Sequence, residues 1–191
     1  MSETAPSRRY PLDSLSARSK PSPAVSLEAL GPSARLSLRL GDDPAIARAG
    51  EAFGVPLPRE ACRLNAANTR STLWLGPDEW LLLAPGEDGP ALHAELSAAV
   101  GETPHSLVDV SERSVGIAVA GPQAATLLNA ACPLDLSLGT CPVGFSSRTV
   151  FAKAEIVLMR LEEERFELEV WRSFAPYVWA YLEEARREFE G

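Results

Sequence analysis

Apolar residues alternate with polar ones along several short stretches, which is the period expected of half-buried strands. The clearest case is residues 34–40, where Leu36, Leu38 and Leu40 alternate with polar or small residues. Similar patterns predict further strands at residues 71–75, 79–84, 106–111, 114–120, 149–161 and 165–171. The first half of the chain is therefore expected to hold four strands and the second half three.

Helical spacing and helix-capping residues lie between these strands. Asp42 or Asp43 is expected to cap the first helix, with Pro44 at its first position. The other helices are predicted to begin near Asp88, near Gly121 and at Ser173. The last helix is expected to turn Phe174 and Tyr177 towards the core.

The order strand, helix, strand, strand, helix, strand is that of a split βαβ, ferredoxin-like unit. The second half repeats this order without a clear closing strand. The sequence therefore predicts an α+β fold with tandem ferredoxin-like halves, at about residues 33–111 and 112–191, that form a single domain with one shared core.

Residues 1–32 differ from the rest because they are rich in Ser, Pro, Ala and Arg and carry few apolar residues. Such a segment buries little surface and is expected to be an extended or flexible N-terminal arm. Two interpretations remain open for it. It is either a leader without fixed structure or an arm that becomes ordered along a partner subunit.

The net charge and the cysteine content indicate which partners and which cellular compartment to expect. The 191 residues carry a formal net charge of −8, which argues against a nucleic-acid partner. Three cysteines without a C-x-x-C pair do not suggest a disulfide scaffold or a zinc ribbon, and they fit a reducing cytoplasm. No apolar run approaches the ~18 residues that a membrane span needs. We therefore expect a cytoplasmic protein with no membrane partner.

The common catalytic motifs do not occur in the sequence. It contains no G-x-G-x-x-G after a strand, no P-loop and no G-x-S-x-G nucleophile elbow. His93 and His105 are interpreted as surface or packing histidines. We predict no catalytic, cofactor-binding or metal-binding residue in this chain.

A smaller set of residues is expected to make structural or partner contacts. Asp109 lies within a predicted strand and should be hydrogen-bonded, with Arg113 or Arg148 as donor, because a buried, unpaired carboxylate is costly. It is either a binding-site acid or a residue that forms an ion pair or a turn at a strand end. Trp74 and Trp171 lie opposite the aliphatic faces of their strands, where they could cover a helix or a partner. The full set of candidates is Trp74, Trp80, Asp109, Arg113, Arg148, Trp171 and Arg172.

An ordered series of short motifs carries a family resemblance over about residues 34–185. The series is LWLGPDEWLL at 73–82, VDVSER at 108–113, AGPQA at 120–124, CPLDL at 132–136, RT at 148–149, KA at 153–154 and RSFA at 172–175. It resembles the gamma subunits of heterotetrameric bacterial sarcosine oxidase.

The resemblance implies a non-catalytic structural subunit with alpha, beta and delta partners. The implied complex demethylates sarcosine oxidatively to glycine, with H2O2 and formaldehyde or 5,10-methylenetetrahydrofolate as products. FAD, FMN, NAD, tetrahydrofolate and zinc are then expected on the other subunits.

That family is in turn similar to the folate-binding domain of the glycine-cleavage T-protein, an aminomethyltransferase. Asp109-Val110-Ser111 matches the T-protein pattern, but Glu112 stands where that pattern has histidine. Residues 150–156 lack the acidic pair that the T-protein carries on a later strand. The alternative hypothesis is a stand-alone folate-binding one-carbon enzyme or sensor that would use Asp109. A third hypothesis, an adaptor in another assembly such as RNA modification, would need a basic patch.

Overall fold

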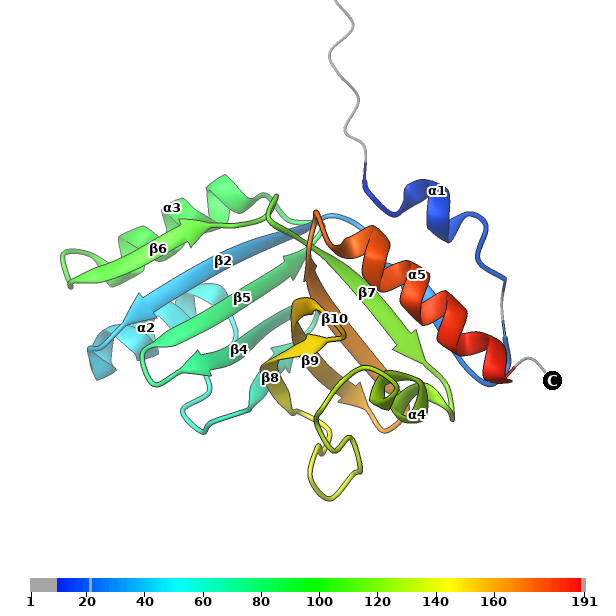
Figure 1. Ribbon diagram of the computed structural model, residues 1–191. Coiled ribbons are helices and arrows are strands. Elements are labelled where there is room, and N and C mark those ends of the chain that lie inside the picture. The colour runs from blue at the N-terminus through cyan, green and yellow to red at the C-terminus, as the bar shows by residue number, and fades with distance from the viewer. Residues whose placement is uncertain (1–9, 21, 190–191) are drawn as a thin grey trace, which may run out of the picture.

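Two antiparallel five-stranded sheets form the framework of the computed structural model, which describes residues 10–20 and 22–189 (Figure 1). The first-half sheet has the order β3-β4-β5-β2-β6, and the second-half sheet has the order β1-β7-β10-β9-β8. The strands of the first-half sheet are β2 (Ser33–Leu40), β3 (Leu64–Ala67), β4 (Arg70–Gly76), β5 (Glu79–Pro85) and β6 (His105–Asp109). Those of the second-half sheet are β1 (Ser26–Ala29), β7 (Ser114–Ala120), β8 (Ser146–Phe151), β9 (Ala154–Glu162) and β10 (Arg165–Trp171).

Helices cover one face of each sheet. The helices of the first half are α2 (Asp43–Phe53) and α3 (Gly89–Val100). Those of the second half are α4 (Ala124–Asn129) and α5 (Ala175–Arg186), with a 3-10 turn, η1 (Arg187–Phe189), after α5. Each half thus combines one sheet with its own helices, which confirms the predicted α+β fold with two similar halves.

Helix capping follows the prediction in the first half only. Asp42 accepts a hydrogen bond from the backbone N–H of Ala45, and Asp88 caps α3 in the same way. The prediction for Ser173 is wrong, since Phe174 occupies the cap position of α5 without a side-chain hydrogen bond. Phe174 and Tyr177 also stand exposed, because α5 packs on the sheet through its opposite side.

Residues 149–161 form two strands where one was expected. β8 and β9 meet in a turn at Ala152 and Lys153, and Ala152 adopts a left-handed backbone with φ 51°. The pattern concealed this turn, since neither residue is a usual turn former. The strand β3 was also not predicted; it lies between the first predicted helix and the strand predicted at residues 71–75.

The segment expected to be an N-terminal arm packs against the second half wherever it is described; residues 1–9 and 21 lie outside the described residues. β1 pairs with β7 from Ser26 opposite Ala120 to Ala29 opposite Ile117. It supplies the additional strand that the second half lacked in the sequence pattern. A short helix, α1 (Asp13–Ser16), precedes it.

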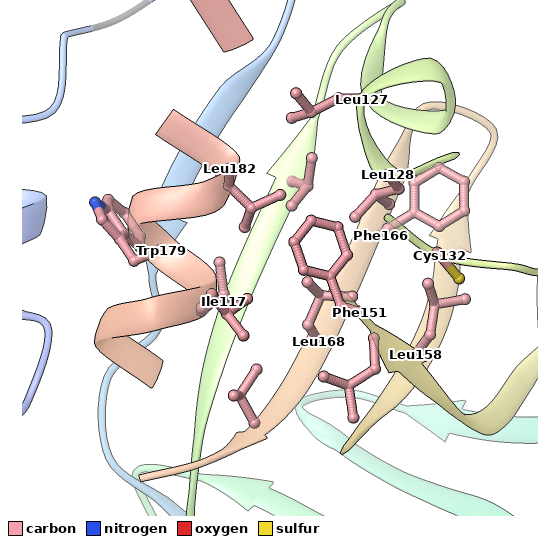
Figure 2. Close-up of a cluster of buried hydrophobic side chains, with 14 of the residues drawn as sticks. Ile117, Leu127, Leu128, Cys132, Phe151, Leu158, Phe166, Leu168, Trp179 and Leu182 are labelled. Carbon is pink, nitrogen blue, oxygen red and sulfur yellow. The ribbon is translucent and has the colours of Figure 1, made fainter. Parts of the chain in front are cut away.

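Three hydrophobic clusters replace the single core that was expected. One lies between α2, α3 and the first-half sheet, and a second lies between the second-half sheet and its helices. Figure 2 shows the second cluster, where Phe151 and Leu168 from the sheet meet Leu182 from α5. Trp179 points from α5 towards the N-terminal segment (Figure 2). Leu12 of that segment belongs to the same cluster. The segment is thereby held by the core of the second half.

The third cluster lies between the two sheets. It contains the buried residues Leu73, Leu81, Leu83 and Met159. The sheets also join through backbone hydrogen bonds, because the N–H of Leu64 donates to the carbonyl of Gly144 at 2.9 Å. The helix-free faces of the two sheets therefore face each other.

A long loop follows α4 and is fixed by one buried arginine. Arg160 on β9 donates to the carbonyl oxygens of Leu136 at 2.9 Å and Cys141 at 2.6 Å. Cys132 and Cys141 are both buried within the second cluster. Burial raises the pKa of the Cys141 thiol above its ordinary value, against the opposing charge of Arg160.

Candidate functional site

A buried ion pair connects the two halves across the inter-sheet space. Arg35 on β2 donates two hydrogen bonds to the Glu169 carboxylate on β10, at 2.6 and 3.0 Å. Their side chains are only 4% and 6% exposed. Burial raises the pKa of the Glu169 carboxyl, while the Arg35 guanidinium acts in the opposite direction. The pair fixes the position of β2 relative to β10, and thus of one sheet relative to the other.

A second charged group bridges the sheets nearer the surface. Glu79 on β5 accepts hydrogen bonds from Arg148 on β8 and, at 2.8 Å, from Arg39 on β2. The hydrogen bond from Arg148 is the largest cause that lowers the pKa of Glu79 below its ordinary value. Arg148, a predicted contact residue, therefore makes a structural contact between the halves.

A narrow cleft remains beside these ion pairs. Its volume is about 150 Å³, its polar lining includes Arg113, Arg148, Glu155 and Glu169, and Trp171 also lines it. A second pocket of about 270 Å³ is lined by both Arg35 and Glu169. Both are smaller than the roughly 300–1,000 Å³ typical of sites that bind drug-sized ligands and cofactors. The inter-sheet space suits a small group or a partner side chain better than a whole folate.

Asp109 does not take the position that the strand pattern suggested. It is exposed, because β6 is an edge strand, and it pairs with neither Arg113 nor Arg148. Its carboxylate accepts hydrogen bonds from the backbone N–H of Ser111, at 2.9 Å, and from the Ser111 hydroxyl. Ser111 in turn accepts from the N–H of Arg35 at 2.9 Å. Asp109 therefore forms the turn between the two halves, which was the other interpretation.

Arg172 and Glu112 pair on the surface beside this turn. Their side chains lie 3.0 Å apart, and the Arg172 N–H donates to the carbonyl of Arg113 at 2.8 Å. Glu112 is the residue that the motif resemblance sets against the T-protein histidine. Here it forms a surface ion pair that connects the turn between the two halves to the end of β10.

The tryptophans take different roles. Trp80 is fully buried in the first-half core and donates its indole N–H to the carbonyl of Pro58 at 2.8 Å. Trp74 is half-buried on β4, whereas Trp171 is 44% exposed at the end of β10. Of the three predicted tryptophans, Trp171 offers the most surface to a partner.

Three charged residues of the inter-sheet site were not predicted from the sequence. Arg35, Glu79 and Glu169 occupy polar positions of alternating strands, which the pattern assigns to solvent. The only sequence feature that could have revealed them is the alternation itself, because the polar face of an alternating strand can pack against another sheet instead of facing solvent. The exposed Val150, Phe174 and Tyr177 also went unrecognised as surface residues.

Within residues 10–20 and 22–189, no three His, Cys, Asp or Glu side chains lie together in a way that could hold a metal ion. In the same residues, every helix is too short or too polar to cross a membrane.

Comparison with known proteins agrees with the motif series. The model of the "Sarcosine oxidase, gamma subunit family" matches residues 40–188. Sarcosine oxidase subunit gamma from Corynebacterium sp. (strain U-96) is 32% identical over 168 residues, which are 87% of this chain and 81% of that protein.

Two solved structures share the fold. A chain of the heterotetrameric sarcosine oxidase from Corynebacterium sp. U-96, solved in complex with pyrrole 2-carboxylate, matches with a TM-score of 0.88 and 30% identity, over 96% of this chain and 97% of that chain. Aminomethyltransferase T of the glycine cleavage system from Bartonella henselae matches with a TM-score of 0.62 and 17% identity, over 83% of this chain and 45% of that chain, which shows a common fold. From the family match and the shared fold together, we conclude that this chain belongs to the sarcosine oxidase gamma subunit family.

Proposed function

We propose that this chain is the gamma subunit of a heterotetrameric sarcosine oxidase and that its role is structural. The observation that carries this proposal is the agreement of nearly the whole chain with a chain of such an oxidase, at 30% identity and a TM-score of 0.88. The partners would be the alpha, beta and delta subunits, in the cytoplasm.

The proposed complex converts sarcosine to glycine by oxidative demethylation. Its products would be H2O2 and formaldehyde, or 5,10-methylenetetrahydrofolate when tetrahydrofolate is present. FAD, FMN, NAD, tetrahydrofolate and zinc would be bound by the other subunits, and this chain would hold those subunits together by burying surface against them.

Local contacts support a structural role. Asp109 forms a turn with Ser111, and Glu112 forms an ion pair with Arg172. The segment at 150–156, which the resemblance sets against the acidic segment of the T-protein, comprises the end of β8, the turn at Ala152 and Lys153, and the start of β9. The turn at Asp109 and the ion pair at Glu112 are contacts within this chain, as expected of residues with a structural role.

The test is co-expression of this chain, carrying an affinity tag, with the genes that neighbour its own. We expect larger flavin-containing subunits to co-purify and the complex to produce peroxide when sarcosine is added. Expression of the same set without this chain should give less assembled complex and less peroxide. A tagged chain that recovers no flavin-containing partner would contradict the proposal.

The same material tests the folate hypothesis directly. Titration of the isolated chain with tetrahydrofolate, followed by calorimetry, should give no saturable binding. An Asp109→Ala variant serves as the control. Saturable binding by the wild type that this variant loses would favour the one-carbon enzyme or sensor instead.

A further inference from the structure

Exposed hydrophobic side chains gather at one end of the second-half sheet. Among the described residues, seven large hydrophobic side chains are exposed, and four of them lie here. They are Val150, Trp171, Phe174 and Tyr177, and each is 40–44% exposed. Single exposed apolar residues are ordinary, but a contiguous group of them marks an interaction surface.

Strand register places Val150 and Trp171 on the same face. Val150 lies opposite Glu155 in the pairing of β8 with β9. The pairing of β9 with β10 ends with Ile156 opposite Val170, so Trp171 follows beside Glu155. Glu155 and Trp171 line the same inter-sheet cleft. Val150 and Trp171 therefore flank one carboxylate in a single row across the sheet.

Phe174 and Tyr177 continue this surface around the end of the sheet. The Phe174 N–H donates to the carbonyl of Trp171 at 2.8 Å in the tight turn that leads into α5. The Tyr177 ring meets the Tyr181 ring edge-on at 6.5 Å, and Tyr181 meets the ring of Phe151 at 5.3 Å. Phe151 follows Val150 in β8 and packs on the helix-covered face, so Phe174 and Tyr177 border this end of the sheet from the helix side, while Val150 and Trp171 border it from the other face.

Two cations border this corner. Arg113 lies beside the turn after β10, since its carbonyl accepts from Arg172, and Lys153 lies in the turn between β8 and β9. Within the described residues, neither side chain forms an ion pair or a hydrogen bond. Arg113 also acts electrostatically on the buried Glu169 carboxylate, which is already paired with Arg35. With the ion-paired groups set aside, Arg113 and Lys153 against the unpaired Glu155 leave one positive charge in excess at this corner of the described chain. The chain as a whole carries −8.

We propose that this corner docks a neighbouring subunit of the oxidase, which presents a carboxylate to Arg113 and Lys153 and apolar side chains to the aromatic rings. We call it the sheet-end surface, and it consists of Arg113, Val150, Lys153, Trp171, Phe174 and Tyr177. The inference rests on the proposed function. Trp, Tyr and Arg are the residues most enriched in the energetically dominant parts of interfaces, and an excess cation on an acidic protein selects an acidic partner surface.

A zero-length crosslink tests the position of the partner's carboxylate. Carbodiimide joins a lysine to a carboxylate in direct contact, and this chain has only two lysines, Lys20 and Lys153. In the purified complex, mass spectrometry should find Lys153 joined to an Asp or Glu of a partner subunit. Lys20 is the internal control and should remain unlinked. Lys153 joined only to a second copy of this chain would overturn the proposal.

Two substitutions test how much the sheet-end surface contributes to the affinity for the partner subunits. Arg113→Glu and Trp171→Ala should each weaken assembly with the partner subunits by about 30-fold or more, as substitutions in the centre of an interface do. Arg48→Glu on α2 and Leu138→Ala in the loop after α4 are matched controls, which should change affinity by less than about three-fold. If Arg113→Glu lowers the thermal midpoint of unfolding, the milder variant Arg113→Gln takes its place in the assembly measurement.

The outcomes separate this inference from the proposed function. A wild-type chain that recovers no partner contradicts the proposed function itself. In the other outcome, the wild-type chain assembles and the folded Arg113 and Trp171 variants assemble equally well. That result overturns the proposal for the sheet-end surface and leaves the proposed function intact.

Discussion

Single charged residues decide how the two sheets meet. The strand pattern correctly grouped residues by face, but it could not show what each face contacts. Glu169 alternates with aliphatic residues exactly as a solvent-facing residue would, yet Arg35 from the other half buries it. Asp109 shows the converse, since a carboxylate expected inside a sheet lies on an edge strand and forms a turn.

The Arg35–Glu169 pair should be costly to break and less costly to replace. Arg35→Met alone or Glu169→Leu alone should lower the free energy of unfolding by about 3 kcal/mol, because each leaves an uncompensated buried charge. The double variant should recover most of that loss. Urea unfolding provides the measurement.

A matched exposed pair gives the control for this cycle. Arg59 and Asp43 form an ion pair in which both side chains are more than half exposed. Arg59→Met should change the free energy of unfolding by no more than about 1 kcal/mol. Equal losses for the buried and the exposed pair would contradict the structural role of Arg35 and Glu169.

Glu79 should make stability depend on acid pH. Its pKa in the folded chain lies below the ordinary 4.5 because Arg148 and Arg39 donate to the carboxylate. The stabilisation is therefore complete above the ordinary value and is lost as the pH falls through the lower folded value. Urea unfolding from about pH 6 to about pH 3 should show a smaller loss of stability in Glu79→Gln than in the wild type. Parallel curves for the two proteins would contradict this assignment.

At the scale of whole elements, sequence patterns located most strands and helices and failed where a turn lacked its usual residues. Ala152 and Lys153 turn the chain between β8 and β9 without Gly, Asn or Pro, so one long strand was predicted there. β1 was missed for a different reason. Four residues in a segment rich in Ser and Pro carry no periodic signal, and β1 exists because β7 offers it a free edge.

The N-terminal segment should contribute to stability, unlike a leader without fixed structure. Leu12 is 2% exposed and packs in the same cluster as Trp179. Leu12→Ala should lower the free energy of unfolding by about 2 kcal/mol through the lost burial and the cavity left behind. Leu138→Ala, at an exposed leucine, should have little effect. A thermal or urea unfolding curve for Leu12→Ala that matches the wild type would show that this segment does not hold the fold.

At the scale of the molecule, the two halves should unfold together. The inter-sheet cluster, the ion pairs and the backbone bonds between residues 62–64 and 144–146 all cross from one half to the other. Variants that retain only Trp80 or only Trp179 report on the first and the second half separately. Their fluorescence transitions in urea should coincide.

Met159 tests the cause of this coupling. It is 1% exposed on β9 and packs against leucines of the first-half sheet. Met159→Ala should shift both fluorescence transitions by the same amount, about 2 kcal/mol or more. A shift of the Trp179 transition alone would mean that the halves fold as separate units.

The loop fixed by Arg160 has a consequence for chemical durability. Thiolates react with peroxide far faster than thiols, and they must be accessible to do so. Cys132 and Cys141 lie inside the second-half core, and burial keeps the Cys141 sulfur protonated. A subunit that works beside a source of H2O2, as proposed here, would thus hide two of its three sulfhydryl groups from the oxidant that its own complex releases.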